Sequence, residues 1–267
     1  MNQLQSGHSL SETFGRHSVD QDERTRRIRR VFEQVAPRYD LMNDLMSFGI
    51  HRLWKRRLVS STLAQPATQL VDLAGGTGDV ARLLRGAGRR VTIIDPSLAM
   101  MAAGRPRNGA GIAYLAGTGE QIPLADDSID ALTIAFGIRN VTSIPAALGE
   151  IARVLKPGGR CLCLEFSKPA VWLRPFYNLY SRLVIPRLGA WVAAAPEAYT
   201  YLVESIRKFP DQEEMKALLQ AAGLEGVTYL NLSFGIACLH VGVKPESARQ
   251  SVRSEVEISH GEPGPVD

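Results

Sequence analysis

A glycine-rich segment, Gly75-Gly76-Thr77-Gly78, separates a short apolar run that ends at Ala74 from a helical pattern that begins at Asp79. A strand, a glycine turn and a helix in this order place backbone N–H groups at the carboxyl end of a sheet, where open α/β folds bind nucleotides. The spacing meets only the relaxed dinucleotide fingerprint, so spacing alone leaves NAD open. Asp79 places a carboxylate where it would repel a pyrophosphate, which favours a phosphate-free adenosyl ligand that carries positive charge.

Asp95 is the second residue whose position indicates chemistry, because it ends the apolar run from Val91 to Ile94. A carboxylate at the end of the strand after the glycine turn accepts hydrogen bonds from ribose hydroxyls. The structural alternative is an acidic residue at a helix start ahead of Pro96. Asp95 therefore indicates a ribose without identifying the cofactor.

The elements that must position these residues alternate between strand and helix. Strands are predicted at 69–74, 91–95, 112–116, 129–135 and 159–166, and helices at 79–87, 97–104, 144–155 and 211–222. This alternation implies right-handed crossovers and a parallel sheet. The last two strands, near 226–232 and 235–243, are too close for a crossover helix, so they form a hairpin. We therefore predict an α/β fold with a seven-stranded, mostly parallel sheet that has one antiparallel strand.

The predicted domain spans 21–244 and includes segments outside this alternation. The tails at 1–20 and 245–267 are predicted to be disordered. Helices are predicted at Asp22 to Val35, where Pro37 ends the helix, and at about 50–60. The first helix carries a basic face, which is either solvated or in contact with lipid headgroups or another anion. Its members are Arg24, Arg26, Arg27, Arg29 and Arg30.

A helical insertion is expected after the fifth strand, at about 171–200, where Pro175 and Pro186 break any single long helix. Its apolar and aromatic residues are a cap over the sheet edge, a lid over an apolar substrate or a surface that rests on a membrane.

The 267 residues, of which 45% are hydrophobic, suffice for one large α/β domain. The net charge of +4 is compatible with an anionic membrane or nucleic acid and requires neither. Three cysteines cannot build a disulfide framework, which favours a reducing cytoplasm. Cys161 and Cys163 share one face of a strand and lack the further ligands of a zinc site, so we expect no metal. We expect neither a signal peptide nor a spanning helix.

Two later motifs distinguish between the cofactors. Gly119 to Asp130 leads into the fourth strand, and Arg153 to Arg160 closes a helix with a Lys-Pro-Gly-Gly turn. Together with the glycine turn, these motifs resemble the Rossmann-like class I S-adenosylmethionine-dependent methyltransferases over about residues 70–166.

Further segments are similar to the ubiquinone/menaquinone biosynthesis C-methyltransferase family over about residues 31–243. They are Phe32–Asp44, Ser47–Lys55, Phe136–Val141, Leu164–Pro169 and Tyr201–Ile206. The resemblance implies S-adenosylmethionine as cofactor and C-methylation of a polyprenylated benzoquinol or naphthoquinol ring. It also implies a cytoplasmic enzyme with peripheral contact to the inner face of the membrane, with a homodimer or a quinone-biosynthesis complex left open.

The resemblance carries cofactor contacts onto the glycine loop and onto the ends of three strands. The expected cofactor-binding residues are Gly75, Gly76, Thr77, Gly78, Asp95, Thr118, Gly119 and Ala135. Thr118-Gly119 and Ala135 depart from the usual residues of the family, which have Asn or Asp followed by Ala, and often Ser, at these positions. We expect weaker or rearranged adenine binding, and the departures leave room for a divergent substrate.

The expected chemistry requires a phenolate beside the methyl donor and an acceptor for a proton. Arg139 is expected to stabilise the phenolate or, alternatively, to tie its loop down with a salt bridge, and a water held by Arg139 and Asn140 would relay the proton. Tyr39 or His51 would contact the quinol, although each alone could be structural.

The alternatives are a methyltransferase of another small aromatic metabolite, an RNA methyltransferase and a non-enzymatic scaffold. The fourth strand lacks the Asn/Asp-Pro-Pro-aromatic motif of amino-methylating enzymes, and we expect no nucleic-acid partner. The intact glycine loop and Asp95 argue against a scaffold that has lost its activity.

Overall fold

The computed structural model describes residues 13–14, 17–18, 20–181, 183 and 196–246. Most of the predicted tails, 1–20 and 245–267, and residues 184–195 of the predicted insertion lie outside the described residues. Two short strands, β1 (Thr13–Phe14) and β2 (His17–Ser18), pair ahead of the first helix.

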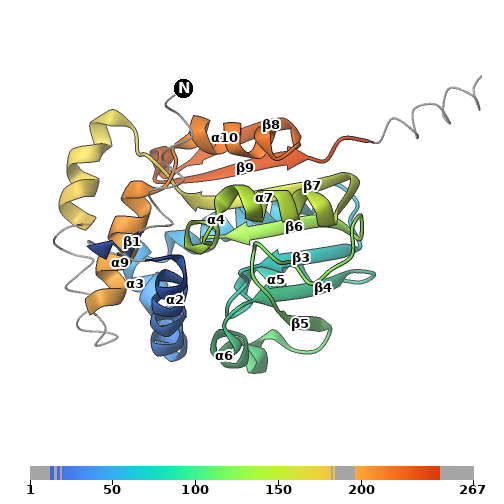
Figure 1. Cartoon of the computed structure of the whole chain (residues 1–267), viewed down its shortest axis with the longest axis horizontal. Coiled ribbons are helices and arrows are strands. Elements are labelled where there is room, and N and C mark those ends of the chain that lie inside the picture. The colour runs from blue at the N-terminus through green and yellow to red at the C-terminus, as the bar shows by residue number, and fades with distance from the viewer. Residues whose placement is uncertain (1–12, 15–16, 19, 182, 184–195, 247–267) are drawn as a thin grey trace, which may run out of the picture.

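A seven-stranded sheet forms the centre of the described chain (Figure 1). Its strands are β3 (Gln69–Leu73), β4 (Arg90–Asp95), β5 (Ile112–Ala116), β6 (Ile129–Ala135), β7 (Leu155–Phe166), β8 (Glu225–Leu232) and β9 (Ala237–Val243). They lie in the order β5-β4-β3-β6-β7-β9-β8, and β9 is antiparallel to both of its neighbours. The predicted mostly parallel sheet with one antiparallel strand is confirmed.

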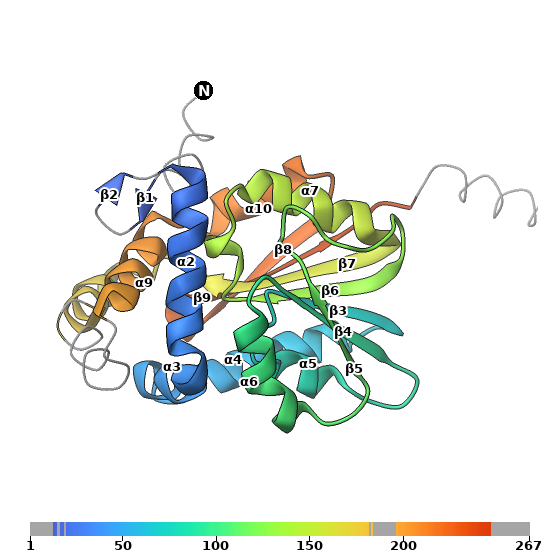
Figure 2. The same ribbon diagram turned by 60° about the horizontal axis from the view of Figure 1, so that its bottom comes forward.

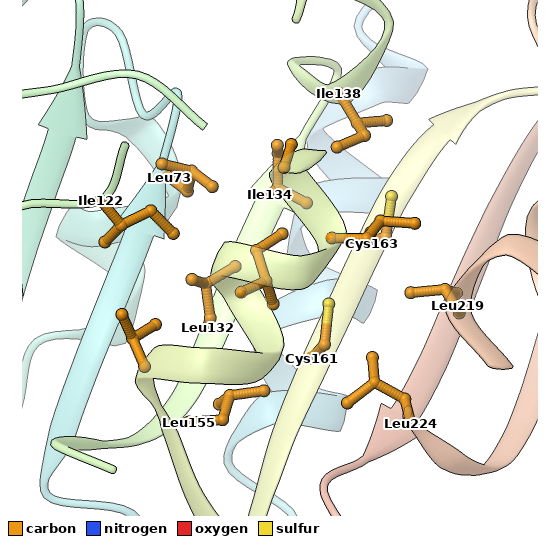
Figure 3. Packing of buried hydrophobic residues seen from close by; sticks show 14 of the residues in the cluster. Leu73, Ile122, Leu132, Ile134, Ile138, Leu155, Cys161, Cys163, Leu219 and Leu224 are labelled. Carbon is orange, nitrogen blue, oxygen red and sulfur yellow. The ribbon is translucent and has the colours of Figure 1, made fainter. Parts of the chain in front are cut away.

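Helices cover both faces of this sheet because side chains alternate along each strand. One face packs against α4 (Ile50–Thr62), α5 (Asp79–Leu84) and α6 (Leu98–Asn108). The other packs against α7 (Ile144–Val154) and α10 (Gln212–Ala221). Cys161 and Cys163 point to this second face and pack among Leu132, Ile134 and Leu219 (Figure 3), so their predicted place in the core is confirmed.

The N-terminal region contains helical structure after Pro37 that was not predicted. Helix α2 (Gln21–Val35) ends where expected, but the chain continues through a 3-10 turn, η1 (Ala36–Arg38), into α3 (Tyr39–Ser47). Pro37 is tolerated there because it lies in the first turn of η1. Backbone N–H groups in a first turn have no acceptor within the helix, so a proline at that position loses no hydrogen bond. Figure 2 shows α2 running across the ends of the strands, so the chain before β3 covers the sheet edge where the site lies.

The insertion is helical where the structure describes it. It contains η3 (Val171–Leu173), a helical stretch at 174–181 and α9 (Pro196–Lys208). These elements lie beside α2 and α3 at the same end of the molecule (Figures 1 and 2). Residues from both groups can therefore surround one site.

The basic face predicted for the first helix is wrong at one position. Arg24 is completely buried, and its guanidinium donates to the carbonyl oxygens of Val141 at 2.9 Å and Arg139 at 3.2 Å. Arg26 and Arg30 are exposed, as predicted. The difference arises because the loop after β6 packs against α2 and has carbonyl groups that need donors.

Candidate active site

A cavity of about 230 Å³ lies at the carboxyl ends of β3, β4 and β6. This is the point where the strand order reverses direction, since β3 lies between β4 and β6, and open α/β sheets bind ligands at such a switch point. Four residues of α2 cover the cavity: Thr25, Ile28, Arg29 and Phe32. The site is thus built from strand ends below and an N-terminal helix above.

Asp95 lies on the wall of this cavity with only 7% of its surface exposed. Its two oxygens accept the backbone N–H groups of Gly76 at 2.8 Å and Ser97 at 2.7 Å. Burial raises the pKa of the carboxyl, and these two N–H groups oppose the rise. Each oxygen keeps a lone pair, so Asp95 can accept the two ribose hydroxyls expected from the sequence.

Of the expected cofactor-binding residues, the structure brings together Gly76, Asp95, Thr118, Gly119 and Ala135, which all line this cavity. Gly76 has a φ of +53°, and an added Cβ would lie 3.1 Å from Met100 Cε. A glycine is therefore needed to keep this wall open beside Asp95. These contacts with a cofactor remain predictions.

The other three expected residues support the loop without lining the cavity. The Thr77 hydroxyl donates to Asp40 Oδ1 of α3 at 2.9 Å, so it ties the N-terminal region to the glycine loop. A Cβ on Gly75 would come 2.9 Å from Asp72, and one on Gly78 would come 2.3 Å from Asn108. Gly75 and Gly78 are thus required by packing.

The sequence argument from Asp79 is wrong in its physical basis. Lys55 lies 3.1 Å and Arg82 lies 3.2 Å from the Asp79 carboxylate, so its charge is neutralised locally. Asp79 is not among the residues that line the described cavities.

A second cavity of about 320 Å³ adjoins the first and is predominantly apolar. Its inner wall is an aromatic cluster in which Phe136 and Phe166 have ring centroids 4.7 Å apart and Trp54 packs within about 6 Å of both. Its outer part comes from α3, the stretch at 171–180 and α9. An aromatic ring that carries a long apolar chain fits such a lining.

Tyr39 and Phe136 line both cavities and form the wall between them. Phe136 adopts a left-handed conformation with a φ of +57°, and so does Ala74 with a φ of +51°. Such strain in residues other than glycine is concentrated at functional sites. Gly137 permits the close approach of these two strand ends, because a Cβ there would lie 2.5 Å from the Ala74 Cβ.

Arg139 lies on the wall of the second cavity with 5% of its surface exposed. One of its terminal nitrogens donates to Glu165 Oε1 at 2.6 Å and to the Phe136 carbonyl oxygen at 2.8 Å, and its Nε has no partner among the described residues. Burial raises the pKa of Glu165, and Arg139 opposes the rise. The predicted salt bridge is present, and the same guanidinium also faces the cavity, so the two predicted roles are compatible.

Asn140 lines the first cavity and a small third one of about 40 Å³ that also touches Tyr39 and Arg139. Its amide oxygen accepts the Tyr201 hydroxyl at 2.9 Å. The third cavity has a mostly apolar lining, but Asn43, Arg139, Asn140 and Tyr201 offer polar groups, and its volume has room for one water, as the predicted relay requires. The three expected catalytic residues therefore meet at one point.

Two tyrosines at the site were not singled out from the sequence. Tyr201 lies in a segment that resembles the family, although nothing in its spacing indicates that it orients Asn140. Tyr177 lines the second cavity, and burial raises its pKa to about 12, so it stays a neutral hydrogen-bond donor. The aromatic content of the insertion is the sequence feature that could have indicated Tyr177.

Within the described residues, no group of three or more His, Cys, Asp or Glu side chains could hold a metal ion. A search of the same residues for a helix long and apolar enough to cross a membrane found none.

The fold and this site define a class I methyltransferase. Among solved structures, the chain is similar to a SAM-dependent methyltransferase from Thermotoga maritima, with a TM-score of 0.59 and 23% identity over 81% of this chain and 99% of that one. It also matches a Haemonchus contortus phosphoethanolamine N-methyltransferase solved with S-adenosyl-L-methionine, with a TM-score of 0.53 and 13% identity over 72% and 52% of the two chains.

The family model of the ubiE/COQ5 methyltransferases matches residues 19–244. A ubiquinone/menaquinone biosynthesis C-methyltransferase of Rubrivivax gelatinosus is 65% identical over 90% of this chain and 95% of its own length. A Caulobacter vibrioides protein of the same name is 46% identical over 88% and 98% of the two chains. The chain belongs to the ubiE/COQ5 methyltransferase family.

The family and the fold imply S-adenosylmethionine as cofactor, and the first cavity fits it. Asp95 would hold the ribose, Thr118 and Gly119 on the same cavity would contact the adenine, and Gly76 leaves space beside the carboxylate.

Proposed function

We propose that this enzyme methylates a ring carbon of a polyprenyl quinol in ubiquinone and menaquinone biosynthesis. The acceptor would be 2-polyprenyl-6-methoxy-1,4-benzoquinol, demethylmenaquinol or both. The observation that carries the proposal is a cavity with the buried carboxylate of Asp95 on its wall, which shares Tyr39 and Phe136 with a second, aromatic cavity. The methyl donor and an apolar ring would meet at this wall.

S-adenosylmethionine supplies an electrophilic methyl group when it is bound. The chain must then make the ring carbon nucleophilic by stabilising negative charge on the neighbouring hydroxyl oxygen. Arg139 is placed to do so, because its guanidinium donates hydrogen bonds on the wall of the second cavity while Glu165 fixes its orientation. A water held by Arg139 and Asn140 in the third cavity would relay the hydroxyl proton away from the oxygen and relay a proton back to it after methylation.

We further propose that the enzyme contacts the inner face of the cytoplasmic membrane, because a polyprenyl quinol partitions into lipid. Exposed aromatic residues surround the outer part of the second cavity, which we call the acceptor cavity. Phe48 and Phe176 line the cavity and are 76% and 67% exposed, and Trp172 stacks edge-on against exposed Phe234 at 5.3 Å. Amphipathic surfaces of this kind bind at the membrane interface.

The test is methylation by the purified protein with S-adenosylmethionine and short-chain analogues of the two quinols, kept reduced and followed by mass spectrometry. We expect one methyl group added to a ring carbon of at least one quinol. The matched control is the oxidised quinone, whose ring carbon is not nucleophilic and should stay unmodified. Binding of S-adenosylhomocysteine without methylation of either quinol would overturn the proposed substrate.

A further inference from the structure

His51 is a buried side chain of the acceptor cavity for which the reaction described so far has no use. It lies in the first turn of α4 with 5% of its surface exposed, and it lines the same cavity as Arg139. Its neighbours determine which of its nitrogens carries the proton.

The hydrogen bonds of Ser47 favour one tautomer of His51. The Ser47 hydroxyl lies 2.7 Å from His51 Nδ1 and 2.7 Å from the Asn43 carbonyl oxygen, which can only accept. When Ser47 donates to Asn43, it accepts from His51, and Nδ1 carries the hydrogen. The lone pair of the neutral imidazole is therefore on Nε2, which forms no hydrogen bond with the described residues.

Asp44 is positioned to stabilise a proton that arrives at Nε2. Its Oδ1 lies 3.8 Å from Nε2, and Arg52 Nε holds the same oxygen at 2.7 Å. The carboxylate is 28% exposed, which gives the proton a route to solvent. An oriented imidazole with a carboxylate beside it is the arrangement of a general base.

We propose that His51 Nε2 accepts the proton that the ring carbon loses after methylation; this inference rests on the proposed function. The new carbon–carbon bond forms as the carbon–sulfur bond of the donor breaks, and its electron pair stays on sulfur. The methylated carbon then carries one hydrogen too many. Its C–H bond breaks, the electron pair returns to the ring, and the proton passes to Nε2 and from there to solvent beside Asp44. One proton is released per methyl group.

The charges around His51 keep it ready for this step. Burial, and then nearby Lys55 and Arg52, lower its pKa to about 4, against the opposing effects of Asp44 and Asp79. The imidazole is therefore unprotonated at neutral pH. A weak base suffices, because loss of this proton restores the aromatic ring.

The tautomer can be tested without cofactor or substrate, by ¹⁵N NMR of the histidine side chains in the full-length protein. We expect a neutral His51 with hydrogen on Nδ1 between pH 6 and 8. Ser47→Ala should shift the signal towards hydrogen on Nε2, because the acceptor at Nδ1 is lost. A signal with hydrogen on Nε2 in the unaltered protein would overturn the inference.

The proton transfer can be tested with a quinol that carries deuterium on the carbon to be methylated. His51→Gln keeps the volume of the side chain and should lower kcat by on the order of 100-fold. It should also create an isotope effect that the unaltered enzyme lacks, because C–H cleavage becomes rate-limiting. His240→Gln is the control, since His240 is buried on β9 away from the cavities.

Affinity for S-adenosylhomocysteine, measured by calorimetry, should be unchanged in His51→Gln. His51 does not line the first cavity, the cofactor cavity, where this ligand would bind. A slow His51→Gln variant with no isotope effect would indicate a packing role and overturn the inference. An unaltered enzyme that binds S-adenosylhomocysteine but methylates no quinol would overturn the proposed function instead.

Discussion

Asp95 shows how one side chain can serve the loop and the ligand together. Each of its oxygens already accepts a backbone N–H, from Gly76 or from Ser97, and these bonds hold the carboxylate against the cofactor cavity. The orientation is thus set before any ligand binds, which lowers the entropic cost of binding.

Asp95→Ala should weaken binding of S-adenosylhomocysteine by about 1–3 kcal/mol, because the ribose hydroxyls and two backbone N–H groups lose their partner. Asp95→Asn keeps one acceptor and should lose less. Titration calorimetry measures both variants. Equal affinity in Asp95→Ala and the unaltered protein would contradict the ribose assignment.

Among the elements, α2 connects the two functions of the site. It covers the cofactor cavity with one face, and its buried Arg24 bonds the carbonyl oxygens of the loop that carries Arg139. Helix α3 adds a second attachment, because Asp40 accepts from Thr77 and pairs with Arg107 at 2.6 Å. Covering the cofactor and ordering the catalytic loop therefore depend on the same N-terminal segment.

Beneath the glycine loop, Asp72 joins three elements. From β3 it accepts the Ala81 N–H of α5 at 3.1 Å and the Thr133 hydroxyl of β6 at 2.9 Å. Burial, opposed by these hydrogen bonds, raises the pKa of Asp72 to about 7. The folded protein therefore keeps a proton that the unfolded chain releases near its ordinary value of 3.8.

The free energy of unfolding should fall as the pH rises from about 4 to about 7, by at most about 1.4 kcal/mol per pH unit from this group. Asp72→Asn cannot ionise and should remove this contribution. Urea unfolding of both proteins at several pH values isolates the effect, and we expect the variant to gain relative stability as the pH rises. Parallel curves would show that Asp72 ionises normally.

At the scale of the molecule, the exposed aromatic residues within the described part of the chain are gathered at the end where the acceptor cavity lies. Phe48 and Phe234 adopt left-handed conformations, with φ values of +49° and +57°, which bulky side chains rarely do. The left-handed backbone at these two residues is locally destabilising, and it leaves both aromatic rings exposed. Burial of the rings in a lipid interface would offset this cost.

Phe48→Asn and Phe234→Asn together should weaken binding to anionic vesicles, while the folded protein keeps or gains stability because Asn tolerates left-handed backbone. Vesicle flotation measures the first effect and thermal unfolding the second. Leu83→Asn, at an exposed position of α5, is the matched control for loss of an apolar side chain. Unchanged flotation of the double variant would exclude these rings as the anchor.

Local patterns were sufficient to predict the sheet, the glycine loop and the position of Asp95 at the end of its strand, because a strand, a glycine turn and an acidic strand end are each encoded within a few residues. The burial of Arg24 could not be predicted this way, since its acceptors lie 115 and 117 residues away in the chain. Thr77 was expected at the cofactor from the family resemblance, and that contact stays a prediction. Its hydrogen bond to Asp40 could not be predicted, because Asp40 lies in α3, a helix that the sequence pattern did not indicate. Both unpredicted contacts join segments that are far apart in the chain.

The wall shared by the two cavities has a consequence for attempts to alter the acceptor. A change at Tyr39 or Phe136 reshapes the space for both ligands, so a gain in acceptor scope there would be accompanied by altered cofactor affinity. Three other side chains line the acceptor cavity but not the cofactor cavity: Trp54, Phe166 and Tyr177. Redesign towards other aromatic rings should therefore begin with these three side chains.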